Sequence, residues 1–241
     1  MPGSVSQNLK NKLLAAGDRK KSVSFAKYFK TGKGQYGEGD IFLGIAVPVQ
    51  RKIALEHAAI PLPQLRFFLQ SKIHEFRFTA LEILVSKYKA APAKEKAALV
   101  KFYLNNLDCV NNWDLVDTSA PQILGSFLLN KDKKILMRLA HSKNYWHRRV
   151  AVVSTLALIR SGSHGDALEI IAFLLSEKQH DLINKAMGWM LREIGDCSRQ
   201  TELAFLRKYS KNLPKITLRY ACEHLPKHLW RGLAKPKSSA A

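Results

Sequence analysis

The sequence predicts an all-α protein built from stacked helical repeats, and three observations support this. Apolar residues recur at spacings of three and four along most of the 241 residues, which is the period of an amphipathic helix. Alternating β-branched runs bounded by turn residues are nearly absent, with Ile41 to Val47 as a short ambiguous piece. Pairs of a basic and a small residue recur along the chain, which indicates a repeat.

Helical periodicity covers nine segments, namely 65–69, 76–88, 97–104, 123–128, 135–139, 150–159, 167–175, 183–194 and 203–209. Four prolines can each occupy a first helical turn, where a missing N–H costs little: Pro61, Pro92, Pro121 and Pro214. Gly162 and Gly195 are expected to end helices. Short helices joined by short turns follow from this punctuation.

The repeat is visible in Arg77-x-x-Ala80, Arg148-x-x-Ala151 and Lys185-x-x-Gly188, whose small residues lie 71 and 37 positions apart. If 71 is two units, a further member falls near Asp117, which stands where the others have Ala or Gly. Units of this length, made of two antiparallel helices, stack into an α-solenoid. We therefore expect a single repeat domain over residues 1–234, curved, with a concave face.

Two segments break this pattern. Residues 31–40 contain four glycines and must form a loop, because glycine loses too much entropy in a helix. This loop lacks the residue order of a nucleotide-phosphate loop; it either tracks a nucleic-acid backbone or only connects two elements. Residues 235–241 are rich in Lys, Pro, Ser and Ala, and we expect a disordered tail.

The net charge of +20 favours a polyanionic partner, and nucleic acid is the first candidate. The two ends, residues 1–34 and 199–241, carry +7 and +8, which leaves +5 for the middle. Solubility alone, a membrane surface and RNA remain alternatives.

The sequence also bears on the compartment in which the protein works. No signal-peptide core and no bilayer-spanning stretch is present. The three cysteines are widely spaced, which suits reduced thiols, so we expect a cytoplasmic protein.

Trp113 and Asp117 are four residues apart, so they lie on one face of any helix that contains both. An inward-facing carboxylate is unusual because burying it without a partner is costly. The alternative is that Asp117 simply pairs with an arginine of the next repeat. Asp114 is expected to point elsewhere and to serve the helix start.

Two further groups carry basic and aromatic side chains. Arg148 and Arg149 project about 100° apart on a helix, so one of them can face a concave surface and bind phosphate. Trp189 and Arg192 share a face and can receive a nucleotide or a cation, unless Trp189 is an ordinary core residue. A zinc site at Cys222-x-His224-x-x-x-His228 is not expected, because Pro226 would bend a helix that aligned the histidines.

Three segments in matching order resemble the DNA alkylation repair glycosylases of the AlkD type: Asn112–Asp117, Asn144–Arg149 and Lys185–Glu193. Phe25–Phe29 and Phe42–Ile45 also resemble the N-terminal part of that family. The resemblance runs from about residue 25 to about residue 224. It implies tandem HEAT-like repeats around duplex DNA and removal of cationic alkylated purines such as N3-methyladenine and N7-methylguanine. The glycine-rich loop is longer than in the family pattern.

Carried over residue by residue, the resemblance makes Asp117 catalytic, with Trp113 and Trp189 as the cleft tryptophans. It implies that Arg149 binds a phosphate of the DNA and that Tyr28 and Arg192 lie in the cleft. Further basic contacts to DNA are expected from Arg148 and Lys185.

The chemistry of an alkylated purine agrees with these roles. Its base is already a cationic leaving group, and a fixed carboxylate stabilises the oxocarbenium-like sugar left behind. Indole faces favour a cationic nucleotide. We expect a monomeric, monofunctional N-glycosylase that needs no metal or organic cofactor and leaves an abasic site in double-stranded DNA. The alternative is a non-catalytic helical scaffold that binds DNA or an acidic protein.

Overall fold

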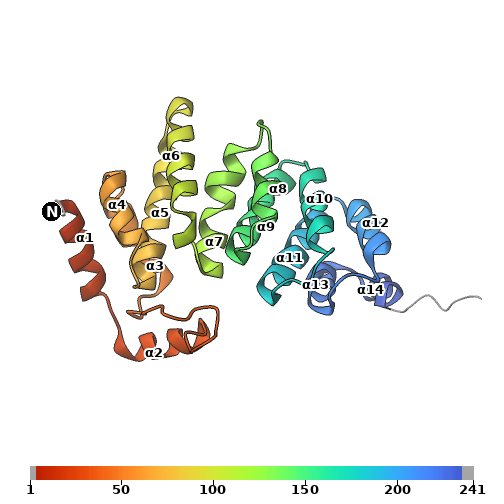
Figure 1. The fold of residues 1–241 in the computed structure, drawn as a ribbon, viewed down its shortest axis with the longest axis horizontal. Coiled ribbons are helices and arrows are strands. Elements are labelled where there is room, and N and C mark those ends of the chain that lie inside the picture. Colours follow the sequence, from red (N-terminus) through yellow and green to blue (C-terminus); the bar gives the residue numbers. More distant parts are fainter. Residues whose placement is uncertain (1–3, 235–241) are drawn as a thin grey trace, which may run out of the picture. The chain divides into compact units, whose positions relative to one another are not determined.

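The computed structural model describes residues 4–234, and every regular element within them is a helix. The one exception to helical pairing in this range is an isolated parallel bridge between Ile41 and Ile73. The all-α prediction is therefore confirmed. The chain forms two compact units, residues 1–123 and 124–241 (Figure 1). The expectation of one repeat domain over residues 1–234 stays a prediction, and the tail at 235–241 lies outside the described residues.

The first unit is organised around one long helix, α5 (His74–Ala90), most of whose side chains are buried. Helices α3 (Val47–Glu56), α4 (Leu62–Leu69) and α7 (Trp113–Ser119) pack against it. The remaining elements are α1 (Ser4–Ala15), α2 (Arg19–Tyr28), α6 (Ala93–Asn105) and the short 3-10 helix η1 (Leu107–Cys109). Because α5 contacts α3 on one side and α7 on another, it holds together the elements that carry the site described below.

The second unit repeats a simple packing arrangement. Helices α9 (Tyr145–Arg160), α11 (Asp181–Cys197) and α13 (Lys215–Ala221) pack in succession, each against the next (Figure 1). Helices α8 (Lys134–Ala140) and α10 (Gly165–Leu174) pack on α9, and α12 (Arg199–Tyr209) packs on α11. The chain ends with η3 (Cys222–His224) and α14 (Lys227–Ala234). This succession of helix pairs is what a helical-repeat protein requires.

The small residues of the sequence repeat are buried where helices approach closely. Ala80, Ala151 and Gly188 lie inside α5, α9 and α11. A Cβ added to Gly188 would lie 2.5 Å from the carbonyl oxygen of Thr217 and 2.6 Å from Cβ of Tyr220, both on α13. Only glycine therefore permits the observed packing of α11 on α13.

Some helix boundaries follow the proline and glycine signals. Pro61, Pro92 and Pro214 are the N-cap residues of α4, α6 and α13. Pro121 begins a π-helical turn, η2 (Pro121–Gly125), so the segment expected to be helical over 123–128 starts within this turn. Gly162, with φ of +88°, follows the end of α9.

The expectation for Gly195 is wrong, because α11 continues past it to Cys197. A Cβ at this position would collide with the carboxyl group of Glu202 on α12. The glycine therefore serves a close contact between two helices and does not end one.

The glycine-rich segment 31–40 is a series of turns between α2 and the buried Phe42. Gly34 and Gly39 have φ of +75° and +87°, the left-handed region that favours glycine. Along residues 4–234 no helix is both long and apolar enough to pass through a bilayer.

Candidate functional site

An open cleft of about 670 Å³ lies in the first unit. Its walls come from α2, from the segment that follows the glycine-rich loop, and from α3, α5 and α7. The residues that line it include Phe25, Tyr28, Phe29, Phe42, Ile45, Gln50, Arg51, His74, Glu75, Phe78, Trp113, Asp114, Asp117 and Thr118. The cleft therefore brings together Tyr28, Trp113 and Asp117, which were expected at a common site.

Four aromatic rings form one side of the cleft. Phe29 stacks on Trp113 with ring centroids 5.3 Å apart and planes 10° apart, and on Phe42 with centroids 4.8 Å apart. Tyr28 meets Trp113 edge to face at 6.0 Å and is itself 65% exposed. One indole face of Trp113 is thus covered by the protein, and an exposed phenol lies next to the indole in a T-shaped arrangement.

Two carboxylates, Asp114 and Asp117, line the cleft from α7. The side chain of Asn112 caps this helix by accepting the N–H of Trp113 at 2.8 Å, which fixes the first turn. Asp117 follows Trp113 by one helical turn, so the carboxylate and the indole share a face of α7, as the spacing predicts. The expectation that Asp114 points elsewhere is wrong, because residues three apart on a helix also share a face.

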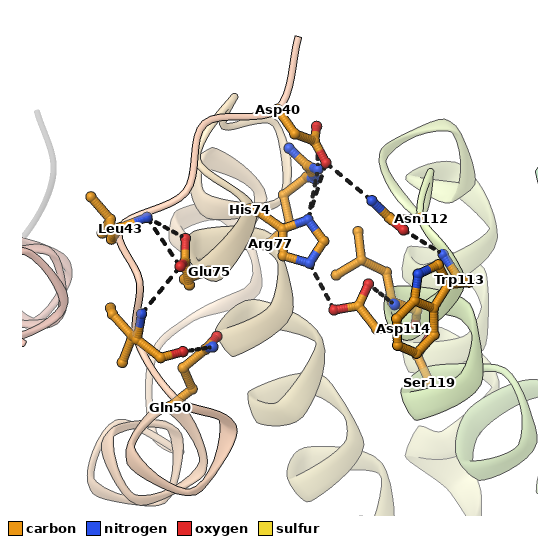
Figure 2. A network of polar contacts seen from close by, with 12 residues as sticks. Asp40, Leu43, Gln50, His74, Glu75, Arg77, Asn112, Trp113, Asp114 and Ser119 are labelled. Atoms are coloured by element: carbon orange, nitrogen blue, oxygen red, sulfur yellow. Dashed lines mark hydrogen bonds and ion pairs between the residues drawn. The ribbon is translucent and has the colours of Figure 1, made fainter. Parts of the chain in front are cut away.

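A buried polar network lies next to Trp113 (Figure 2). The Nε2 atom of His74 is 2.7 Å from Asp114 Oδ2, and its Nδ1 atom is 3.1 Å from Asp40 Oδ2. Arg77 donates from Nη2 to Asp40 Oδ1 at 2.7 Å and from Nη1 to the Ser71 carbonyl oxygen at 2.8 Å. The network joins the end of the glycine-rich loop to α5 and α7.

The acidic and basic side chains in this network shift each other's pKa values. Burial opposes the charge on His74, but Asp114 and Asp40 outweigh it and raise the pKa of the imidazole above its usual value. Burial likewise opposes the charge on Asp40, but His74 and Arg77 outweigh it and lower the pKa of that carboxyl. Both shifts favour the charged forms.

Glu75, on α5, fixes the backbone between the loop and α3. Its carboxylate accepts the N–H groups of Leu43 at 2.9 Å, Gly44 at 2.8 Å and Ile45 at 3.3 Å (Figure 2). Gln50 donates from Nε2 to the Ile45 carbonyl oxygen at 2.7 Å. These bonds hold the chain next to Phe42, a ring of the cleft wall.

A run of positive charge lies next to the cleft. Exposed cations follow one another along α2 and the glycine-rich loop: Arg19, Lys20, Lys21, Lys27, Lys30 and Lys33. Because α2 also supplies Ser24, Phe25 and Tyr28 to the cleft, this basic helix forms part of its rim. Such a rim attracts a polyanion.

The other predicted site residues lie in the second unit, on α9 and α11, which pack together. Arg149 is 5% exposed and donates from Nη1 to the Leu182 carbonyl oxygen, so it is the buried member of the arginine pair. Arg148 is half-buried and donates to the Ser142 carbonyl oxygen at 2.7 Å. The structure thus separates two adjacent arginines that spacing alone left equivalent.

On α11, Trp189 is half-buried and donates from Nε1 to Glu193 Oε1 at 2.8 Å. Arg192 forms an ion pair with Glu223, and Lys185 is half-buried. Within residues 4–234 no group of three or more His, Cys, Asp or Glu side chains could hold a metal ion.

Sequence reasoning missed Asp40, His74 and Glu75. Asp40 was seen only as the last residue of a glycine-rich loop, and His74-Glu75 lies just before a segment recognised for its apolar period. The signal that could have found them is the density of charged residues in His74-Glu75-Phe76-Arg77, at the start of a helix that is otherwise buried.

Comparisons with known proteins agree with one another. The family model described as DNA alkylation repair enzyme matches residues 9–225. A solved structure from Enterococcus faecalis, described as a "predicted DNA alkylation repair enzyme", is 19% identical, with a TM-score of 0.67 over 88% of this chain and 97% of that one. At this identity the likeness shows a shared fold. No curated protein matches the sequence.

Proposed function

The chain belongs to the DNA alkylation repair enzyme family, and from this premise we propose that it is a monofunctional N-glycosylase. Its substrate is duplex DNA that contains cationic alkylated purines, N3-methyladenine and N7-methylguanine, and its product is an abasic site. The proposal rests mainly on the position of Asp117. Its carboxylate lines the cleft on the same helical face as Trp113.

The proposed reaction uses the charge that the lesion already carries. The bond between the sugar C1′ and the base nitrogen breaks, its electron pair moves to the cationic ring, and the base leaves as a neutral molecule. Asp117 stabilises the positive charge that develops on the sugar, and water then attacks C1′ and releases a proton. The aromatic wall excludes water from one side of the cleft, which strengthens the attraction between the carboxylate and that charge.

The aromatic residues select for the lesion in this proposal. A cationic purine is attracted to the face of an indole or phenol ring, whereas a normal neutral purine lacks this attraction. Trp113 and Tyr28 supply such rings in the first unit, and Tyr28 is exposed. By the resemblance, Trp189 of the second unit contributes in the same way.

Contacts to the DNA backbone come from basic side chains. We assign Arg149 to this role from the resemblance, which also gives Arg192 a place in the cleft. Arg148 and Lys185 are assigned from their positive charge beside these residues, and the exposed cations of α2 from their position at the cleft rim. The burial of Arg149 and its bond to the Leu182 carbonyl oxygen give it a structural role as well. Arg149→Ala is therefore expected to weaken duplex binding and base release together and also to lower the melting temperature.

Release of N7-methylguanine from a methylated duplex, measured in single turnover, tests the function. The wild-type protein should release the base, and Asp117→Asn should abolish release while duplex affinity stays within a few-fold. Glu95→Gln is the matched control, since it removes an exposed carboxylate of the same unit, in the first turn of α6. Unchanged release by Asp117→Asn would refute the mechanism. A wild-type protein that binds the duplex and releases nothing would instead be the non-catalytic scaffold.

A further inference from the structure

One imidazole ties together three parts of the first unit. His74 stands at the start of α5, and its side chain is 3% exposed. Its Nδ1 atom reaches Asp40 at the end of the glycine-rich loop, 34 residues away in sequence, and its Nε2 atom reaches Asp114 in the first turn of α7, 40 residues away (Figure 2). The backbone also joins the loop to the start of α5, since the Ile41 carbonyl oxygen accepts the His74 N–H at 2.8 Å. The link onward to α7 is made by side chains, from His74 to Asp114 and from Asn112 to Asp40.

Both ring nitrogens of His74 face carboxylate oxygens, and a carboxylate only accepts hydrogen bonds. Arg77 Nη2 also lies 3.4 Å from Nδ1, which is farther than the 3.1 Å to Asp40. We assign a proton to both ring nitrogens because this gives each carboxylate a donor, and a histidine with two N–H groups is a cation. The charged groups that face it are Asp40 from the loop, Asp114 from α7 and Arg77 from its own helix. The raised pKa of His74, for which the two carboxylates outweigh burial and Arg77, agrees with this assignment.

The His74 ring also contacts the aromatic side chains of the cleft through its faces. His74 stacks on Phe42 with centroids 4.5 Å apart and planes 22° apart, and lies 5.0 Å from Phe29. Phe29 in turn stacks on Trp113. Trp113 is thus supported from His74 by two routes, one through Asp114, its neighbour in sequence, and one through the Phe29 ring.

We propose that His74 is a positioning residue for base release, which holds the start of α7 against the glycine-rich loop and so keeps Trp113 and Asp117 in place. The inference rests on the proposed function, because it concerns the geometry of the same cleft. The glycine-rich loop then has a role beyond connecting two elements, since through Asp40 it anchors the imidazolium that orients α7.

A pH dependence follows from the two protons. When the pH rises through the pKa of His74, the ring loses one proton and can donate to only one carboxylate. The other buried carboxylate then faces a lone pair and is repelled, which loosens either the loop or the start of α7. Base release should therefore fall on the alkaline side, while the exposed lysines and arginines that attract DNA keep their charge.

His74→Gln tests this, with His57→Gln as the matched control. His57 is also a buried histidine of the first unit, but its nitrogens face the Ile53 carbonyl oxygen and the Asn8 side-chain amide, both at 2.8 Å. An amide can turn to donate its NH2 group to a neutral ring, so His57, unlike His74, has a partner that does not require a second ring proton. Single-turnover release and duplex affinity are measured for all three proteins from about pH 6 to about pH 9, around the titration range of histidine, on samples whose folded fraction is known from circular dichroism.

The expected result is a split between rate and binding. His74→Gln lowers the rate of release at low pH by on the order of 100-fold, the effect of a misplacement of about 1 Å, while duplex affinity stays within a few-fold. It also removes the alkaline decline that the wild-type protein and His57→Gln share. Equal rates for His74→Gln and wild type, or the same alkaline decline in both, would overturn the proposal. Absence of release by the wild-type protein would refute the proposed function instead.

Asp40→Asn provides a second test, which does not depend on the stability of the histidine variants and adds proteolysis of the loop, a readout independent of catalysis. It weakens the bonds from His74, Arg77 and Asn112 to the loop and leaves Asp114 in place. Trypsin should then cleave faster at the exposed Lys33 in the loop, and the rate of release should fall. If cleavage at Lys33 and the rate of base release both equal those of the wild-type protein, the contact between Asp40 and His74 neither holds the loop nor positions the cleft residues.

Discussion

Phe29 and Trp113 stack almost in parallel, with ring centroids 5.3 Å apart and planes 10° apart. The protein therefore occupies one face of the indole that a cationic base would otherwise use. Tyr28, which is exposed, makes a T-shaped contact with the same indole at 6.0 Å. Under the proposed function a lesion must approach Trp113 from a side that Phe29 does not cover, so the orientation of the indole decides whether the contact forms.

Phe29→Leu is expected to reduce base release several-fold. The stacked pair contributes about 1 kcal/mol beyond its buried area, and losing that amount from the transition state corresponds to about five-fold in rate. Single-turnover release of N7-methylguanine measures the effect. Phe67→Leu is the control, because Phe67 is 68% exposed on α4 and does not line the cleft. A normal rate for Phe29→Leu would mean that Trp113 keeps its orientation without the stack.

The double variant Lys20→Ala and Lys27→Ala is expected to bind duplex DNA more weakly and with a smaller dependence on salt. Lys20 and Lys27 are exposed and lie four residues before and three residues after Ser24, which lines the cleft, so they flank it on one helical face. Each phosphate contact adds about 0.9 to the slope of log K against log salt, so the slope should fall by about two.

Lys94 and Lys101 provide the control for this charge effect. Both are exposed on α6 of the same unit, and neither belongs to the cleft. Replacing this pair removes the same charge and should leave the slope close to that of the wild type. Equal slopes for the two double variants would show that net charge alone attracts DNA. The lysines of α2 would then contribute no more to DNA binding than those of α6.

Local patterns predicted the part of the site that lies on one helix. Trp113 and Asp117 share a face because helical spacing is a property of neighbouring residues, and both line the cleft. The starts of α4, α6 and α13 followed in the same way from prolines, since the missing N–H acts within one turn.

The rest of the site depends on contacts between distant residues, which no local pattern contains. His74 meets partners 34 and 40 residues away, and the identity of those partners is set by how α5 packs on α7. The prediction that Gly195 ends a helix was wrong for the same reason. This glycine leaves room for the Glu202 side chain of the next helix, a contact that local sequence does not reveal. Spacing also could not decide which of Arg148 and Arg149 is buried, since both positions are compatible with a helix.

Glu202 is expected to make the protein less stable as the pH rises. It is 1% exposed, and burial, with Asp196 nearby, raises its pKa from 4.5 to about 8. The folded state therefore holds a proton that the unfolded chain releases near pH 4.5. The resulting stabilisation is complete below that pH and is lost as the pH rises to about 8.

Glu202→Gln keeps the shape of the side chain and cannot ionise, so it should remove this part of the pH dependence. Melting temperatures measured at several pH values check the difference between the two proteins. Glu169→Gln, at an exposed position on α10 of the same unit, should keep the wild-type dependence. Parallel curves for wild type and Glu202→Gln across this window would show that Glu202 is ionised throughout.

Gly188→Ala should destabilise the second unit, whereas Gly165→Ala should not. A methyl group at 188 would meet the backbone of Thr217 and the Cβ of Tyr220, both on α13, and backbone cannot move aside cheaply. Overpacking of this kind costs about 1–3 kcal/mol. A methyl group at 165 meets nothing within 4 Å, and alanine there restricts the unfolded chain, so stability should be unchanged or slightly higher. Denaturant unfolding of both variants measures the difference in free energy, and equal midpoints would mean that α11 and α13 are not held as closely as Gly188 allows.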